Sequence, residues 1–256
     1  MKIYQFGDSP CCMKVRMALF EKGLEWEEVF IESWKFDHFQ PDYLKLNPLG
    51  IVPTLVDKEK VLTQSNVIVE YLEDAYSSPS LRPKDAYSIA TMRKWMFIEQ
   101  DYLFRDIVTM SFNTMMKLRV EGFGLEQLKE WSRRHPDQEK AQDYLRRIAA
   151  PSDPEADESA QKSFRRFMLM LEQDLAMHQF DWICGKQFTL ADICLAGIMD
   201  RIIYLDREDL LMDLPRVQQW LDMLKQRDSY INGQHKFSSR MWGPKKPVSE
   251  YRDLIK

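Results

Sequence analysis

The sequence of 256 residues predicts two domains, a small α/β domain followed by an all-helical domain. Strand and helix patterns alternate over residues 1–78, whereas strand patterns nearly vanish after them. The serines and prolines of residues 77–83 have the composition of a linker. We therefore expect one domain over residues 1–78, a linker over residues 79–87 and a second domain over residues 88–256.

The composition narrows the class of protein. Hydrophobic residues make up 45% of the chain, which is typical of a folded globular protein rather than a disordered one. Acidic residues outnumber basic residues by 40 to 36, and this balance argues against nucleic acid as the main ligand. The sequence has neither the pattern of a signal peptide nor an apolar run of about 18 residues. We therefore expect a cytoplasmic protein that does not associate with membranes.

Metal and nucleotide sites find no support in the sequence. The four cysteines do not form two spaced pairs, and the four histidines follow no metal-binding spacing. The nine glycines form neither a dinucleotide-binding fingerprint nor a phosphate-binding loop. We therefore expect no bound metal and no nucleotide cofactor.

The elements of the first domain follow one another in a simple order. The patterns predict a strand (2–6), a helix (11–22, ending at Gly23), a strand (26–31), an irregular or helical segment to Leu46, a turn (47–50), a hairpin (54–56 and 60–63) and a helix (65–76). A crossover unit followed by a hairpin unit predicts a mixed four-stranded sheet with helices on its faces.

A long helix is predicted at the start of the second domain. One apolar stripe runs at helical spacing from Ile89 to Met110, and a second stripe on another face includes Trp95, Tyr102 and Phe112. Either one stripe packs into the core while the other faces a cleft or a partner, or both stripes belong to the core.

The later part of this domain contains one unusual segment and a marked helix start. Residues 122–154 are polar, charged and interrupted by prolines, and we interpret them as a peripheral insertion with a solvated surface. Amphipathic helices are expected over residues 164–175 and 214–227. Thr189 and Asp192 have the spacing of a capping box, and the apolar helix that follows should be the buried centre of the domain.

The segment Ser9-Pro10-Cys11-Cys12 lies where the first predicted strand gives way to the first helix. Unpaired amides at a helix N-terminus stabilise a sulfur anion. Ser9 and Cys12 have the spacing of a C-x-x-C redox motif in which serine replaces the first cysteine, so that motif's disulfide cannot form. Ser9 could donate a hydrogen bond to a thiolate supplied by a ligand, or it could only cap the helix.

A second group of residues is suited to binding a short peptide. Pro53 cannot donate to a strand ladder and is a candidate for a cis peptide bond, which leaves Val52 beside it free to pair with an extended peptide. Gln64-Ser65 opens a helix, where amides and a hydroxyl can hold a carboxylate. Together with Ser9, these residues imply a small peptide with a thiol at one end and a carboxylate at the other. Ordinary turn and cap chemistry would explain each of them alone.

The whole chain resembles the cytosolic glutathione transferase superfamily in motifs that cover both predicted domains. The matching segments, in order, are S-P-C-C-M-K-V-R-M-A-L, N-P-L-G-I-V-P-T-L, L-T-Q-S-N-V-I-V-E-Y-L-E and F-T-L-A-D-I. The resemblance implies a thioredoxin-like N-terminal domain and an all-α C-terminal bundle that contributes the acceptor-substrate pocket. It also implies glutathione as the cosubstrate and a homodimer.

The resemblance assigns roles to the residues of the motifs. Ser9 takes the place of the family's catalytic serine, and Val52 pairs with the glutathione backbone beside a cis-Pro53. Gln64 and Ser65 bind the γ-glutamyl end.

Further positions match less closely. His38 is near a position that contacts the glycyl end, although a solvated surface histidine fits equally well. Asp101, on the long helix that we expect at the dimer interface, is a candidate to reach the amine of the partner's glutathione. The acceptor pocket is expected to include Pro10, Tyr102, Met110 and Phe112.

The resemblance extends to subgroups that catalyse different reactions. The segment S-L-R-P-K-D-A-Y-S-I-A-T-M-R-K-W, with the arginine-rich insertion, resembles bacterial members that cleave β-aryl ethers. Ser9-x-Cys11 also resembles zeta-type isomerases and tetrachlorohydroquinone reductive dehalogenases, in which a cysteine at the position of Cys11 takes part in catalysis. The additional Cys12 departs from both patterns. Because consecutive helical side chains diverge by about 100°, only one of the two sulfurs can face the cleft, and we expect it to be the sulfur of Cys11.

The predicted activity is attack of the glutathione thiolate on an apolar, aromatic electrophile, as in detoxification or aromatic catabolism. One alternative is glutathione-dependent reductive dehalogenation or cis–trans isomerisation that uses Cys11. Another is a non-catalytic thioredoxin-like binding protein.

Overall fold

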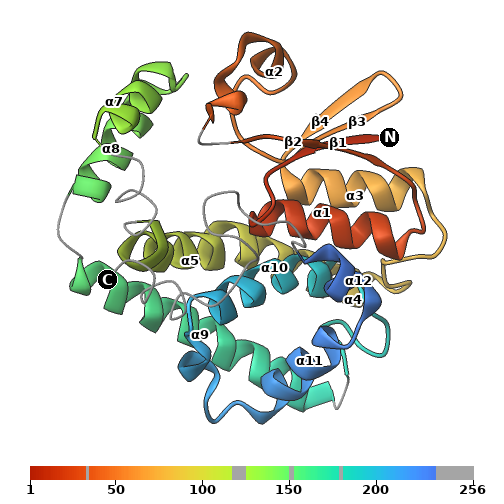
Figure 1. Cartoon of the computed structure of the whole chain (residues 1–256). Helices are drawn as coiled ribbons and strands as arrows, with labels where there is room; N and C mark the ends of the chain where they lie inside the picture. The colour runs from red at the N-terminus through yellow and green to blue at the C-terminus, as the bar shows by residue number, and fades with distance from the viewer. Residues whose placement is uncertain (33–34, 117–124, 150–152, 179–180, 235–256) are drawn as a thin grey trace.

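The computed structural model describes residues 1–32, 35–116, 125–149, 153–178 and 181–234 of the chain (Figure 1). The described strands are β1 (Lys2–Gln5), β2 (Glu27–Phe30), β3 (Thr54–Asp57) and β4 (Lys60–Thr63). They form one sheet in the order β2-β1-β3-β4, in which β1 is parallel to β2 and the other pairs are antiparallel. The predicted mixed four-stranded sheet is therefore confirmed.

Three helices accompany the sheet. They are α1 (Pro10–Glu21), α2 (Pro41–Leu46) and α3 (Ser65–Ala75). Helices α1 and α3 lie side by side along one face of the sheet, and α2 lies on its other side (Figure 1). Ile3, Val15 and Leu72 are fully buried between sheet and helices, so this layer has its own apolar core.

The rest of the described chain is helical. Its helices are α4 (Ala86–Ile98), α5 (Phe104–Ser111), α7 (Leu125–Arg134), α8 (Gln138–Ala149), α9 (Pro154–His178), α10 (Leu190–Tyr204), α11 (Pro215–Lys225) and α12 (Asp228–Gly233). This confirms the predicted all-α second domain, of which the part after residue 234 lies outside the described residues. Within the described ranges, no helix combines the length and the apolar character that crossing a bilayer requires.

Helix α10 is the buried centre of the helical domain, as predicted. Every residue of α10 except Ile203 is buried. The capping box is present at its start, where the fully buried Asp192 carboxylate accepts hydrogen bonds from Thr189 N at 2.8 Å and Thr189 Oγ1 at 2.9 Å. The same carboxylate accepts from Ile183 N at 3.1 Å and from Trp220 Nε1 at 2.9 Å. Asp192 therefore joins the start of α10 to α11 and to the segment that precedes α10.

Helix α10 also fixes the loop that leads into α1. A Cβ atom at Gly197 would lie 2.5 Å from the carbonyl oxygen of Pro10, so the two backbones can approach this closely only with glycine at that position. One turn further along α10, Arg201 Nη2 donates a hydrogen bond to the carbonyl oxygen of Asp8 at 2.6 Å. The β1–α1 loop is thus held from the helical domain.

A buried ion pair crosses the junction between the two domains. The ammonium of Lys14 on α1 lies 3.0 Å from both carboxylate oxygens of Glu99, and it donates to Asn66 Oδ1 at 2.8 Å. The side chains of Lys14 and Glu99 are only 3% and 1% exposed. Burial opposes the charge of Lys14, but the Glu99 carboxylate outweighs this effect and raises the pKa of Lys14.

Helices α7 and α8 correct the interpretation of residues 122–154 as a peripheral insertion. They form a helical hairpin that stands beside the bundle and faces the side of α2 (Figure 1). Its arginines form exposed ion pairs with Glu130 and Asp143, which accounts for the solvated appearance of the sequence. Its other side carries rings, and Trp131 lies with its centroid 6.1 Å from that of Phe39 in the sheet domain.

Candidate active site

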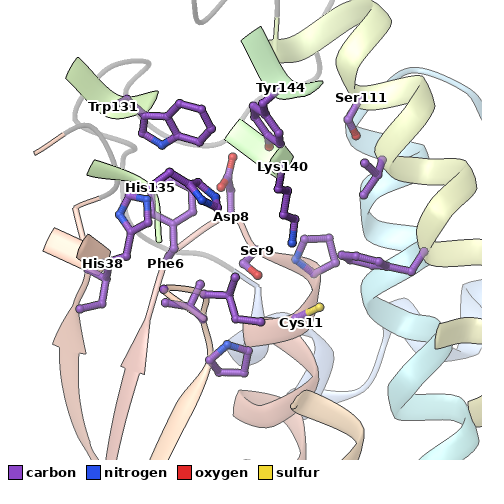
Figure 2. A pocket seen from close by; sticks show the side chains of 18 of the residues that line it. Phe6, Asp8, Ser9, Cys11, His38, Ser111, Trp131, His135, Lys140 and Tyr144 are labelled. Atoms are coloured by element: carbon purple, nitrogen blue, oxygen red, sulfur yellow. The ribbon is translucent and has the colours of Figure 1, made fainter. Parts of the chain in front are cut away.

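A cavity of about 560 Å³ opens between the sheet domain and the helical hairpin. The start of α1, residues 50–53 and the start of α3 form its floor, α5 forms one wall, and α7 and α8 form its roof. Figure 2 shows Ser9 and Cys11 at one end of the cavity and Trp131 and Tyr144 at the other. The predicted site residues that line the cavity are Ser9, Pro10, Cys11, His38, Val52, Pro53, Gln64, Ser65 and Phe112.

Ser9 both caps α1 and lines the cavity. Its Oγ accepts a hydrogen bond from Cys12 N at 3.3 Å, and Pro10, whose fixed φ suits a first helical residue, begins the helix. A hydroxyl has one hydrogen to donate and two lone pairs, so the cap uses a lone pair and leaves the hydrogen available. The structural and the functional interpretation of Ser9 are therefore compatible, and its role toward a ligand thiolate stays a prediction.

The two adjacent cysteines point in different directions. Cys11 is half-buried and lines the cavity, whereas Cys12 is fully buried in the core. Burial raises the pKa of Cys11, although Lys14 and a hydrogen bond from Ser65 act in the opposite direction. Burial likewise raises the pKa of Cys12, to about 11. Desolvation therefore opposes the ionisation that the helix N-terminus was expected to favour, and a catalytic role of Cys11 stays a prediction.

The turn beside β3 presents a free backbone to the cavity. The Val52–Pro53 bond is cis, as predicted. The turn is held from behind, since the Tyr43 hydroxyl donates to the Ile51 carbonyl oxygen at 2.5 Å and Asn47 Nδ2 donates to the same oxygen at 2.7 Å. In the part of the chain that the structure describes, the amide and carbonyl of Val52 have no hydrogen-bond partner. This backbone can pair with an extended ligand.

Gln64 and Ser65 meet the cavity at the N-terminus of α3. Gln64 has a φ of 69°, a left-handed conformation that non-glycine residues rarely adopt. Ser65 is the first residue of α3, is buried and lines the cavity. Such a helix start favours a carboxylate.

His38 lies in the cavity wall rather than on a solvated surface. It is half-buried, its neighbour Phe39 lies with its ring 5.0 Å from that of His135, and His135 Nδ1 accepts from Asp137 N at 2.9 Å. Burial, followed by the proximity of His135, lowers the pKa of His38 to about 4. Burial, followed by the charge of Lys140, also lowers the pKa of His135. Both imidazoles are therefore neutral near pH 7.

Of the predicted acceptor-pocket residues, Pro10 and Phe112 line the cavity and the other two do not. Met110 is 1% exposed and belongs to the core, and Tyr102 is 40% exposed and packs against Phe167 with centroids 4.9 Å apart. Asp101 is half-exposed and also lies outside the cavity wall. A π-helical turn over Glu99–Leu103 explains the error. It shifts the faces that follow, so an ideal α-helical stripe cannot be extended through it.

The hairpin supplies side chains that the sequence analysis missed. Trp131 and Tyr144 have ring centroids 5.1 Å apart, and Tyr144 lies 4.5 Å from Phe112, so three rings form a continuous aromatic wall. Lys140 also lines the cavity. Trp131 and His135 are four residues apart and would share one helix face, which could have indicated a cavity-lining side of the hairpin. The many charged residues around them obscured this pattern. Among the described residues, no His, Cys, Asp and Glu side chains are grouped as metal ligands would be.

Two sequence families match the chain in succession. Residues 8–75 match the family described as Glutathione S-transferase, N-terminal domain, and residues 129–222 match Glutathione S-transferase, C-terminal domain. These matches lie on the sheet domain and on the helices from α7 to α11.

Similar proteins are found over both domains. Protein LigF from Sphingobium sp. (strain NBRC 103272 / SYK-6) is 31% identical over 240 residues, which cover 89% of this chain and 90% of LigF. Glutathione S-transferase Z1 from Arabidopsis thaliana is 39% identical over 98 residues, which cover 38% of this chain and 44% of that protein. The crystal structure of β-etherase LigF from Sphingobium sp. strain SYK-6 superposes with a TM-score of 0.80 at 28% identity, covering 91% of this chain and 97% of LigF.

Proposed function

This chain belongs to the glutathione S-transferase family, and we propose that it uses Ser9 to activate the thiolate of glutathione for attack on an aromatic ether. Glutathione transferase activity, with glutathione as cosubstrate, follows from the family. The proposal adds the activating residue and the class of acceptor.

The aromatic wall opposite Ser9 is the observation that carries the choice of acceptor. Phe112, Trp131 and Tyr144 form this wall, and aromatic rings bind aryl groups by stacked and edge-to-face contacts. The similarity to LigF, described as a β-etherase, supports an ether because it covers 91% of this chain and therefore extends through both domains. The similarity to the zeta-class protein Z1 covers only 38% of this chain and gives less support to an isomerase.

Three parts of glutathione have a suitable place on the floor of the cavity. The free backbone of Val52 can pair with the peptide, and Gln64 with Ser65 can hold the γ-glutamyl carboxylate. The hydroxyl hydrogen of Ser9 can then reach the sulfur at the N-terminus of α1, where helix amides also favour negative charge. The thiolate faces the aromatic wall, and an acceptor between them is held close to the nucleophile.

A panel of acceptors tests the reaction class. The purified protein is incubated with glutathione and, separately, with an aryl ether, a haloaromatic compound and a maleyl compound, and the products are separated by chromatography. We expect the aryl ether to give equal amounts of a glutathione thioether and a free phenol. Turnover of the haloaromatic or maleyl compound without ether cleavage would contradict the proposed acceptor.

Two leucine variants test the aromatic wall itself. Trp131→Leu should raise the KM for the ether several-fold and leave the KM for glutathione unchanged, because only the acceptor contacts the wall. Phe20→Leu, at an exposed ring near the end of α1 outside the cavity, is the matched control and should change neither constant. If the two variants changed the KM for the ether equally, the aromatic wall would not be the acceptor-binding surface.

The quaternary state and the compartment belong to the same proposal. We expect a homodimer, because Val67, Tyr87 and Phe97 on α3 and α4 are 55%, 72% and 56% exposed in one copy. Asp101 stays the candidate that reaches the partner's glutathione. A monomer by light scattering at micromolar concentration would contradict the dimer. The cytoplasm is the proposed compartment, because cells keep glutathione reduced there.

A further inference from the structure

Lys140 is a solvent-exposed lysine at the start of a helix. It is the third residue of α8, where the free amides of the helix carry partial positive charge and favour acidic side chains. Asp137 Oδ1 caps this helix end by accepting from Lys140 N at 2.9 Å. No described side chain forms an ion pair or a hydrogen bond with the Lys140 ammonium. Helix stability therefore gives no reason for a lysine at this position.

The Lys140 side chain is directed into the cavity. Figure 2 shows it running from α8 past Tyr144 toward the end of the cavity where Ser9 lies. Arg201, another cation in the wall, is buried and already bonded to the carbonyl oxygen of Asp8. In the described part of the wall, Lys140 is therefore the cation with a flexible stem and an uncommitted ammonium.

The position of Lys140 indicates which negatively charged atom of the bound substrates its ammonium would bind. The γ-glutamyl carboxylate and the thiolate of glutathione already have suitable groups on the floor of the cavity, at Ser65 and at Ser9, and the glycyl end is expected near His38 in the wall. Lys140 approaches from the opposite side, on the same hairpin as Trp131 and Tyr144. An aryl group packed on these rings brings the oxygen to which it is attached within reach of the same helix. That oxygen becomes negative when the ether bond breaks.

We propose that Lys140 binds the oxygen of the departing phenol and thereby extends the enzyme's acceptors to ethers of weakly acidic phenols. This inference rests on the ether cleavage proposed above. In the step, the glutathione sulfur forms a bond to the ether carbon, and the carbon–oxygen bond breaks. The oxygen keeps the bonding pair and leaves as phenoxide, which accepts a hydrogen bond from the Lys140 ammonium and then a proton from water. The proton of the glutathione thiol has already gone to solvent, so no oxidant or reductant is needed.

A series of ethers that differ only in the acidity of the released phenol tests this role. Wild-type protein, Lys140→Gln and Lys140→Arg are compared with Lys129→Gln, a control on α7 whose lysine is exposed and paired with Glu126. A hydrogen bond to a charged group is lost in Lys140→Gln, so kcat/KM should fall about tenfold or more for the least acidic phenol and little for the most acidic one. Lys140→Arg should keep most of the activity, and Lys129→Gln should behave as wild type.

A binding measurement gives a readout that does not depend on turnover. 4-Nitrophenol is titrated with pH in the presence of protein and glutathione, and its phenolate absorbance is followed. Wild type and Lys129→Gln should lower the apparent pKa of the bound phenol, and Lys140→Gln should not. A loss in Lys140→Gln that is equal across the ether series, or that appears only in the KM for glutathione, would overturn the role of Lys140 and leave ether cleavage intact. If wild type cleaves no ether and does not shift the phenol, both the ether cleavage and the role of Lys140 are wrong. If it shifts the phenol without cleaving ethers, the ether cleavage is wrong and Lys140 keeps only the binding of a phenolate oxygen.

Discussion

Replacing Ser9 by alanine and, separately, by glycine distinguishes its two contributions, the cap of α1 and the stabilisation of a thiolate. Alanine at an N-cap costs about 1 kcal/mol of stability, whereas glycine costs only a few tenths. Both variants lose the hydroxyl, whose hydrogen bond to a charged acceptor is worth about 1.5–3 kcal/mol. At about 1.36 kcal/mol per pKa unit, this loss should raise the pKa of bound glutathione by roughly 1–2 units.

The pH dependence of kcat reveals the loss of the hydroxyl. Below the pKa of the bound thiol, both variants should be about 10–100 times slower than wild type, because a smaller fraction of the thiol is ionised. The loss should shrink as the pH rises, since the thiol then ionises unaided. Thiolate absorbance in the complex measures the pKa directly, and urea denaturation measures the cap. Equal losses of kcat at every pH, or loss only in the less stable alanine variant, would refute the role of Ser9 toward glutathione.

Four further changes have defined outcomes. Asp192→Ala removes a buried carboxylate that accepts four hydrogen bonds, so the free energy of unfolding by urea should fall by about 3–5 kcal/mol while the KM for glutathione of the folded fraction stays unchanged. Ser65→Ala should raise the KM for glutathione more than it lowers kcat, and an unchanged KM would argue against carboxylate binding. Burial raises the pKa of Asp106 from 3.8 to about 6, so its contribution to stability is present below pH 3.8 and is lost as the pH rises through 6. Asp106→Asn should therefore stabilise the protein by about 1–3 kcal/mol at pH 8 and by less at pH 5, and an equal gain at both would exclude this explanation. Cys11 should be alkylated before the buried Cys12 and be protected by glutathione, and labelling of Cys12 first would reverse this assignment.

The fold could be predicted from the sequence because its signals are local. The strand and helix periods of the first domain, the break before Pro10 and the capping box at Thr189 each depend on a few neighbouring residues. Chain order then limits the topology, since a crossover unit followed by a hairpin has few arrangements. The apolar positions that these patterns predict to be buried are the ones that form the core of the folded protein.

The floor of the site was predictable for the same reason, and its roof was not. Ser9, Val52 and Ser65 lie at element boundaries that short motifs mark. The roof depends on how a helical hairpin turns toward a distant domain, and the ion pairs on its outer face dominate its composition. Tyr102 was misplaced because it lies within a π-helical turn, which interrupts the period that the prediction assumed.

The ion pair of Lys14 and Glu99 limits how this protein could exchange parts with its relatives by recombination. Lys14 belongs to the sheet domain and Glu99 to the helical domain. Both side chains are almost fully buried, so solvent cannot stabilise either charge if its partner is lost. A chimera that kept Lys14 and received a helical domain without an acid at the position of Glu99 would bury an unpaired charge, at a cost of about 3–5 kcal/mol. The two domains should therefore be inherited as a matched set. New acceptor preferences would then arise more readily by exchange of the α7–α8 hairpin, which lies away from α1 and α4 (Figure 1).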